Sequence, residues 1–188
     1  MDLLKTLHSR TSSPRLAGVV PSEEALEGLF QAAMRAPDHA QLRPWRFLLV
    51  SGDDRKALGD LFAKAMIEDS PELSSIELDK IKSKPLRAPL IIVAIASIQS
   101  HPKVPEIEQV LSAGAAVQNL LLAAYASNIG AMWRTGSMAF HKTVMEGLGL
   151  SNNEQIVGFV YIGEQQGKSK QIFPLDSQQY FKIWPKAQ

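Results

Sequence analysis

The chain has 188 residues, of which 45% are hydrophobic and 21% charged, and its formal net charge is +1. The length fits one domain, and the composition is typical of a globular protein with a sizeable core. The near-neutral charge disfavours a general nucleic-acid binder, and the absence of cysteine excludes disulfides, thiolate nucleophiles and cysteine-ligated metal centres.

No targeting or membrane segment is expected. The first residues lack the basic and then apolar layout of a signal peptide. The longest apolar segment, residues 113–126, is interrupted by Gln118 and Asn119, whereas a membrane span needs about 20 mostly apolar residues. We therefore expect no membrane span, and a cytoplasmic location is the natural expectation.

The first half of the chain predicts helices around one strand. Leu3, Leu4 and Leu7 share one helical face and predict a short opening helix, and a loop rich in hydroxyls and arginine follows over residues 9–15. Ser22 is a good N-cap before two glutamates, and apolar residues then recur at helical spacing. The next predicted elements are a strand at 45–51, an amphipathic helix around 58–66 that is broken by Ser70 and Pro71, and a more exposed helix around 73–81.

The second half contains the most apolar segments. Residues 89–96 form a continuous run rich in β-branched side chains, which is typical of a strand buried on both faces. Residues 106–127 predict a long helix that is apolar nearly all round and therefore central and buried. A turn follows, and residues 156–162 predict a last strand. The segment 168–188 is too apolar for a plain disordered tail, and its aromatic residues are expected to pack on something, such as a second subunit: Phe173, Tyr180, Phe181 and Trp184.

Three or more strands therefore lie among helices, without regular alternation of strand and helix. This arrangement favours a mixed α+β sheet over a doubly wound fold. We expect residues 1–188 to form a single domain.

The most informative motif joins a predicted helix to the strand that follows it. It reads R-A-P-D-H-A-Q-L-R-P-W-R-F over residues 35–47 and presents cationic and hydrogen-bonding side chains beside an aromatic residue. Pro37 disfavours helix at the residue before it, so the helix should end there. Arg35 either donates to the polar edge of a heteroaromatic ligand or complements the C-terminus of the helix, and both roles can hold together. His39 is a further candidate donor or stacking partner.

Two other loops carry candidate binding residues. The loop before the second helix offers a guanidinium and hydroxyls that suit a phosphate, and the alternative is a solvated turn. The loop over residues 130–136 has a glycine at each end, which permits close backbone approach to a ligand, and the alternative is a tight turn around a core tryptophan. The candidates in the two loops are Arg10, Thr11 and Ser12, and Trp133, Arg134 and Thr135.

Familiar catalytic and metal-binding motifs are absent. The sequence contains no G-x-G-x-x-G after a strand, no phosphate-binding G-x-x-x-x-G-K-[ST] loop and no G-x-S-x-G elbow. The four histidines are scattered, and Asp38 with His39 would make at most half of a metal site. We therefore predict no metal and assign no catalytic residue.

These segments together resemble the nitroreductase family. The family's helix-to-strand motif typically reads R-A-P-S-S-x-N-x-Q-P-W-x-F, which is similar to residues 35–47, and its N-terminal R-R-S-x-R is similar to residues 9–15. The helix over residues 112–124 looks like the family's buried helix and leads to the W-R-T-G of residues 133–136. The resemblance covers nearly the whole chain and is closest to the short bacterial members, which carry M-R-A-P-D-H and W-R-S-G.

The resemblance implies FMN bound at the interface of a homodimer, with each site drawing on both subunits. It implies an α+β fold with a mixed, largely antiparallel sheet flanked by helices, and a C-terminal segment that reaches across the partner. Carried over residue by residue, it assigns contacts in the flavin site to Arg10, Thr11, Ser12, Arg35, His39, Trp133, Arg134 and Thr135.

The chain departs from the family's usual motif at several positions. Asp38 and His39 replace serines, Gln41 replaces asparagine and Arg43 replaces glutamine. Because the short members share most of these changes, they bear on substrate choice more than on FMN binding. Thr11 stands where the family has a second arginine, which weakens that anchor slightly.

The activity implied by the resemblance is electron transfer from NAD(P)H, through FMN, to a nitroaromatic, quinone-like or other oxidised small molecule by ping-pong kinetics. The protein would orient the flavin and supply donors near its pyrimidine edge, for which Arg35 is a candidate. The alternatives are a flavoprotein of the same fold with other redox chemistry and a non-catalytic FMN-binding protein. No nucleic-acid or membrane partner is expected.

Overall fold

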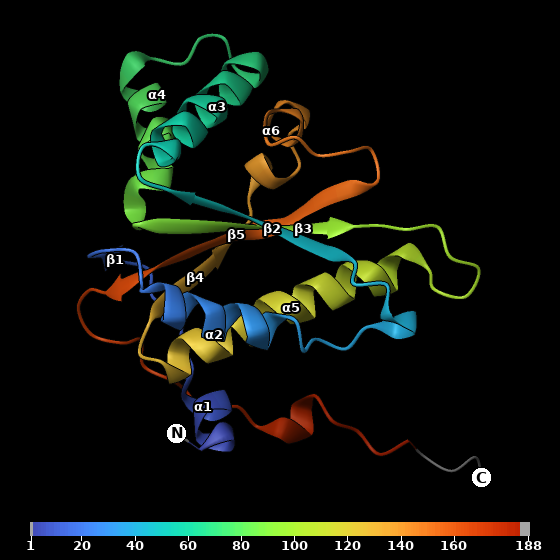
Figure 1. The fold of residues 1–188 in the computed structure, drawn as a ribbon. Helices are drawn as coiled ribbons and strands as arrows, with labels where there is room; N and C mark the ends of the chain where they lie inside the picture. Colours follow the sequence, from blue (N-terminus) through green and yellow to red (C-terminus); the bar gives the residue numbers. More distant parts are fainter. Residues whose placement is uncertain (1, 185–188) are drawn as a thin grey trace.

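A central antiparallel sheet organises the computed structural model, which describes residues 2–184 (Figure 1). The strands lie in the order β2–β3–β5–β4, and the two-residue β1 pairs with the C-terminal end of β5. Every strand pairing is antiparallel, so the expected α+β fold with a largely antiparallel sheet is confirmed. The strands are β1 (Leu16–Ala17), β2 (Trp45–Ser51), β3 (Leu90–Ser97), β4 (Gly130–Arg134) and β5 (Glu154–Gln165).

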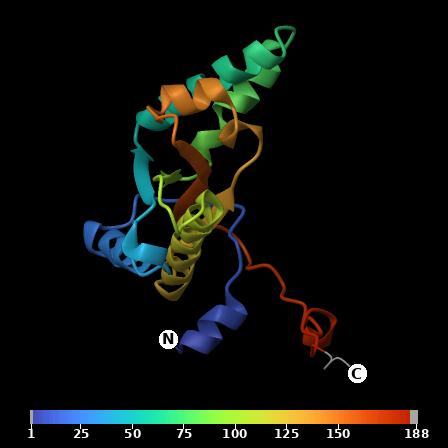
Figure 2. The same cartoon turned by 90° about the vertical axis from the view of Figure 1, so that its right-hand side faces the viewer.

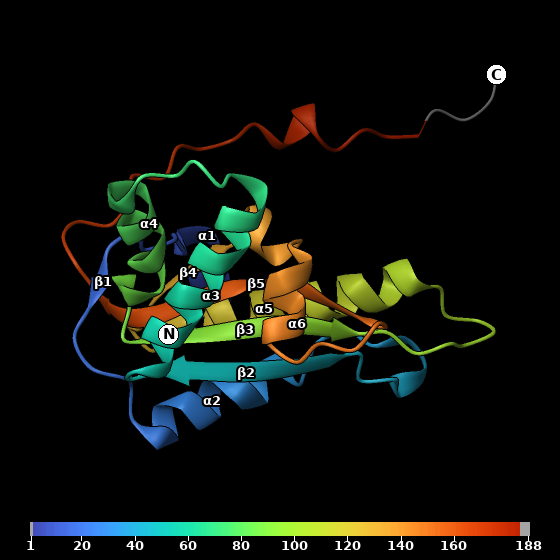
Figure 3. The same ribbon diagram turned by 90° about the horizontal axis from the view of Figure 1, so that it is seen from above.

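Helices cover both faces of the sheet. On one face lie α2 (Glu23–Ala33) and α5 (Glu106–Ala126), and on the other lie α3 (Asp54–Asp69), α4 (Ser75–Lys82) and α6 (Lys142–Gly147) (Figures 1 and 3). Short 3₁₀ segments complete the connections: η1 (His39–Gln41), η2 (Lys84–Arg87), η3 (Ser137–Ala139) and η4 (Ser177–Gln179).

Strand β3 explains why the sequence shows an unbroken apolar run. Ile91 and Val93 belong to the core under α3, whereas Leu90 and Ile92 belong to the core under α2 and α5. Successive side chains of a strand point to opposite faces, so a strand between two helical layers needs apolar residues at every position. The prediction that this strand is buried on both faces is confirmed.

Local sequence signals also set the helix ends. The Ser22 hydroxyl accepts a hydrogen bond from the backbone N–H of Ala25 at 3.3 Å, which caps α2 as predicted. Ser70 ends α3, also as predicted. The periodicity did not reveal α6 or β1, and β5 extends beyond the predicted strand at both ends.

The expectation that α5 is buried all round is wrong for the single chain. Val117 and Leu120 are buried against the sheet, but Ile107 and Leu111 are 61% and 64% exposed. By length and hydropathy α5 is the one described helix that would suffice for a membrane span. Its inner face packs in the core beside α2, as a core helix does.

Both ends of the chain project from this body. Helix α1 (Leu3–Ser9) and the segment after β5 extend to the same side, away from the sheet (Figure 2). In α1, Leu3 and Leu4 are mostly exposed. The aromatic residues of the C-terminal segment do not pack on the described part of their own chain, with exposed fractions of 67% to 90% for Phe173, Tyr180, Phe181 and Trp184.

Candidate functional site

The loop after α1 is held beside strand β4. The backbone N–H of Arg10 ends α1 by donating to the carbonyl of Thr6 at 2.9 Å. Three residues later, the backbone N–H of Ser13 donates to the carbonyl of Ala131 at 2.9 Å. The hydroxyl of Ser13 also donates to Oε1 of Gln165 at 2.8 Å. The segment from Arg10 to Ser13 is therefore fixed against β4 and β5.

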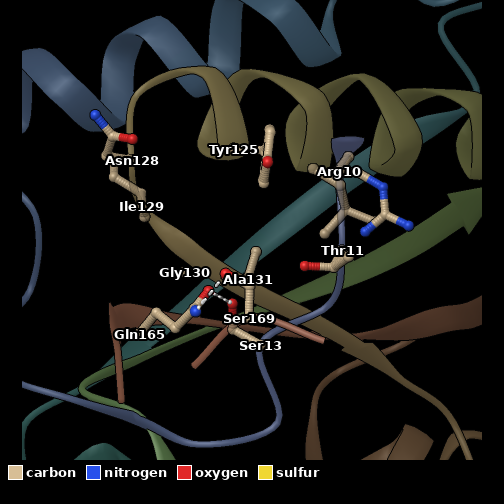
Figure 4. Close-up of a pocket in the computed structure, with 11 residues that line it drawn as sticks. Arg10, Thr11, Ser13, Tyr125, Asn128, Ile129, Gly130, Ala131, Gln165 and Ser169 are labelled. Atoms are coloured by element: carbon tan, nitrogen blue, oxygen red, sulfur yellow. Dashed lines mark hydrogen bonds between the residues drawn. The ribbon is translucent and has the colours of Figure 1, made fainter. Parts of the chain in front are cut away.

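A cavity of about 280 Å³ opens beside this loop (Figure 4). Its wall combines the loop, the C-terminal half of α5 and the end of β5. In the close-up, Tyr125 descends from α5, and Gln165 bridges Ser13 and Ser169, donating to the hydroxyl of Ser169 at 2.9 Å. The lining residues are Arg10, Thr11, Ser13, Leu121, Tyr125, Asn128, Ile129, Gly130, Ala131, Gln165 and Ser169.

A second cavity of about 300 Å³ adjoins the first, since Arg10 and Leu121 line both. Its other lining residues are Ser12, Gln118, Trp133 and Thr135. The structure thus gathers five of the eight predicted residues around two adjoining cavities, with Thr11 in the first and Ser12, Trp133 and Thr135 in the second.

The indole of Trp133 is fixed from behind. Its Nε1–H donates to the carbonyl of Val157 on β5 at 3.2 Å. Gly158 lies directly against this ring, and a Cβ there would overlap Nε1. The ring is therefore both a partly buried packing element and a wall of the second cavity. Trp133 thus packs against the core as expected, but it lies in strand β4 (Gly130–Arg134) rather than in a tight turn, and its contact with a ligand stays a prediction.

The electrostatics of the paired cavities favour an anion. Among the described residues, Arg10 contributes the only charged side chain to either lining. Within residues 2–184, its guanidinium has one long hydrogen bond, 3.5 Å to the hydroxyl of Ser12, and no ion pair. A guanidinium whose charge is not neutralised and whose N–H groups are mostly free can bind a phosphate or a carboxylate.

Arg134 lines neither cavity. Its Nη2 donates to the carbonyl of Pro14 at 3.3 Å, and its guanidinium lies over the ring of Tyr161, 5.3 Å from the centroid. Its Nε is buried and has no partner among the described residues. Burial raises the pKa of Tyr161, and the charge of Arg134 opposes this rise. In the single chain, Arg134 therefore ties the end of β4 to the loop after Ser13.

Arg35 and His39 lie near the other end of α5. Arg35 lines a separate cavity of about 330 Å³, together with Asp38, Gln41, Arg43 and Trp45 among others. Nδ1 of His39 lies 2.7 Å from Oε2 of Glu108. Glu108 and Gln118 are ten residues apart on one helix, which corresponds to about 15 Å. One chain alone thus does not bring Arg35 and His39 to the cavities that Arg10 lines.

The loop that carries His39 is strained and firmly held. Ala40, Gln41 and Arg43 have φ values of 61°, 54° and 48°, a left-handed backbone that non-glycine residues seldom adopt. The N–H of Arg43 donates to Oδ2 of Asp38 at 2.6 Å, and Nε2 of Gln99 donates to the carbonyl of Leu42 at 2.7 Å. Such backbone strain clusters at functional sites.

Sequence reasoning missed the amide and hydroxyl side chains of the cavity walls. Gln118 interrupts the apolar face of α5, and that interruption was a usable signal. Tyr125, Gln165 and Ser169 carried no comparable signal, because only the fold brings them together. Another cavity of about 650 Å³, between residues 98–106 and 152–155, contains no predicted residue. No cluster of three metal-ligating side chains occurs within residues 2–184.

Comparison with known proteins agrees with this fold. The family model described as "Nitroreductase family" matches residues 9–164. The Escherichia coli K12 protein named "Putative NAD(P)H nitroreductase YdjA" is 38% identical over 169 residues, which are 90% of this chain and 91% of that protein. The crystal structure of a nitroreductase-like family protein from Bacillus cereus has a TM-score of 0.83 at 22% identity and covers 97% of this chain and 96% of its own. The crystal structure described as that of a "putative nitroreductase in complex with fmn" from Desulfovibrio desulfuricans has a TM-score of 0.73 at 25% identity and covers 98% of this chain and 99% of its own.

Proposed function

The chain belongs to the nitroreductase family, and we propose that it is an FMN-dependent oxidoreductase that transfers electrons from NAD(P)H to an oxidised organic acceptor. The name of the E. coli relative supports NAD(P)H as the reductant, and the Desulfovibrio structure supports FMN as the cofactor. Nitroaromatic and quinone-like compounds are the proposed acceptor classes.

One observation carries the proposal: two adjoining cavities meet at an arginine that has no counter-ion among the described residues, beside hydroxyls and an indole. The donor set fits FMN, because guanidinium and hydroxyl groups bind phosphate and Arg10, Thr11 and Ser12 supply them. The described linings also contain no carboxylate that would repel the phosphate. Trp133 and Thr135 would contact the flavin from the side of β4. Arg134 would hold the end of that strand in place.

We propose that the active unit is a homodimer of single-domain subunits, each formed by residues 1–188. Its interface would bring Arg35 and His39 of the partner subunit to the cavities beside Arg10. The exposed apolar residues of α1, of the outer face of α5 and of the C-terminal segment support this proposal, because isolated chains seldom leave so much apolar surface uncovered. The C-terminal segment would then lie across the partner.

When bound, FMN would supply the two-electron redox chemistry. The protein's own part would be to anchor the phosphate, hold Trp133 rigidly against β5 and place the cationic side chain of Arg35 beside the flavin ring. NAD(P)H and the acceptor would use the same open face in turn, which predicts ping-pong kinetics. No side chain of the site is assigned as an acid or a base.

The test is to purify the full chain and examine it for flavin absorption, before and after adding FMN. Reduction by NADH and NADPH and reoxidation by a nitroaromatic and by a quinone should follow. A colourless protein that ignores added FMN would contradict the proposal. A yellow protein that NAD(P)H does not reduce would indicate a non-catalytic flavin binder, and reduction without turnover of either acceptor would indicate other redox chemistry.

A further inference from the structure

The contact between His39 and Glu108 has a chemical consequence for the proposed site. The carboxylate of Glu108 can only accept a hydrogen bond, so the imidazole of His39 must donate through Nδ1 at the 2.7 Å contact. In the neutral ring, Nε2 then carries a lone pair. Nε2 of His39 has no hydrogen-bond partner within residues 2–184. This nitrogen is therefore free to meet a ligand.

The backbone around His39 is fixed by the same face of α5. Ser112 follows Glu108 by four residues, and residues four apart on a helix lie on one face. The hydroxyl of Ser112 donates to the carbonyl of Pro37 at 2.8 Å, two residues before His39. Helix α5 thus holds this segment at its backbone through Ser112 and at its side chain through Glu108.

The His39–Glu108 pair adds little to the stability of the fold. The side chains of His39 and Glu108 are 54% and 45% exposed. Ion pairs as exposed as this one contribute little to the free energy of folding. The pair does act on the tautomer, because a carboxylate at hydrogen-bond distance from Nδ1 selects which ring nitrogen carries the proton.

We propose that Glu108 is a positioning residue for His39, holding it as the Nδ1–H tautomer so that Nε2 is presented to the flavin bound by the partner subunit. This inference rests on the proposed function, which places His39 in the flavin site. Glu108 itself does not touch the flavin. Its influence on FMN binding should therefore disappear when the imidazole of His39 is absent.

The first test reads the tautomer without FMN. Long-range ¹H–¹⁵N NMR spectra of the full chain distinguish the Nδ1–H from the Nε2–H form, and a His39→Gln variant assigns the His39 signals among the four histidines. We expect the Nδ1–H form in the natural chain and a shift toward the Nε2–H form in Glu108→Leu. An Nε2–H ring in the natural chain would overturn the proposal. This measurement is independent of whether the protein binds FMN.

The second test is a double-mutant cycle on the dissociation constant of FMN. Glu108→Leu should weaken binding about tenfold in the natural chain and less than about twofold in a His39→Ala background. Glu108→Gln should restore much of the affinity, since the amide oxygen still accepts from Nδ1–H. Glu106→Leu is the matched control, because it removes another carboxylate from the first turn of α5. An equal loss in both backgrounds would overturn the proposal, whereas no FMN binding by the natural chain would instead refute the proposed function.

Discussion

Arg46 and Glu154 form a two-pronged ion pair across the sheet. Nε of Arg46 donates to Oε1 of Glu154 at 2.6 Å, and Nη2 donates to Oε2 at 2.7 Å. The pair joins β2 to β5, which are separated by β3. The side chain of Glu154 is only 7% exposed, and its Oε2 also accepts from the backbone N–H of Ser151 at 2.9 Å. The hydrogen bonds from Arg46 are the main reason that the pKa of Glu154 falls from 4.5 to about 2.

This lowered pKa predicts how stability depends on pH. The pair stabilises the fold fully above about pH 4.5, where the unfolded carboxyl is ionised, and the contribution is lost as the pH falls toward 2. Glu154→Gln should lower the free energy of unfolding by about 2 kcal/mol at pH 7 and by much less at pH 3. Urea titrations at both pH values measure this difference. Glu146→Gln is the control, because Glu146 is exposed and its Oε1 lies 3.5 Å from Nζ of Lys142. If Glu154→Gln lost the same free energy of unfolding at both pH values, the prediction would be contradicted.

Arg10 should dominate the affinity for FMN. Arg10→Ala removes the only charged group from both described cavity linings, and FMN should bind about ten- to a hundredfold more weakly. Fluorescence titration of the flavin-free protein measures the dissociation constant. Arg15→Ala is the matched control, because Arg15 carries the same charge five residues away and lines neither cavity. Unchanged affinity in Arg10→Ala would remove this residue from the site.

Two glycine substitutions should change stability in opposite directions. A Cβ at Gly158 would overlap the indole of Trp133 and lie 2.9 Å from the carbonyl oxygen of Arg134. Gly158→Ala should therefore lower the free energy of unfolding by about 1–3 kcal/mol and alter tryptophan fluorescence. Gly28 lies in α2, and a Cβ added there would meet no described atom within 4 Å, so Gly28→Ala should raise stability by about 0.5–1 kcal/mol. Destabilisation of both variants alike would show that the packing against Trp133 is not the cause.

The C-terminal segment should govern the monomer–dimer equilibrium. Phe173 and Phe181 are 70% and 80% exposed in the single chain, and burial of a phenylalanine contributes about 2 kcal/mol. Replacing either with alanine should weaken dimerisation at least about tenfold, as measured by analytical ultracentrifugation. Lys182→Ala, next to Phe181, is the control and should have little effect. A dimer that both phenylalanine variants leave intact would place the interface elsewhere.

The elements that the sequence predicted well are those whose signals are local. The cap at Ser22 and the apolar period after it define α2 without reference to the rest of the chain. The apolar run of β3 is easy to recognise in the sequence because both faces of the strand are buried. Helix α6 has only six residues, which is too short for a periodic pattern to emerge. Its position depends on contacts with α3 that the local sequence does not specify.

The candidate site was predictable as residue types but not as geometry. Arg10 and Trp133 are far apart in sequence, and the pairing of β4 with β5 and the hydrogen bond from Ser13 to Ala131 bring them together. Gln165 and Ser169 come into reach only because β5 ends at the same place. Arg35 lines a different cavity from Arg10, and His39 contacts the first turn of α5. Their proposed part in the site would depend on dimer assembly, which no local pattern encodes.

Helix α5 connects these two ends and therefore sets the distance between them. It holds His39 through Glu108 and lines the second cavity through Gln118. Inserting one residue between those positions would rotate one end relative to the other by about 100° and lengthen the helix by about 1.5 Å. The proposed function therefore requires the ten-residue spacing between Glu108 and Gln118 on α5 as well as the two side chains themselves.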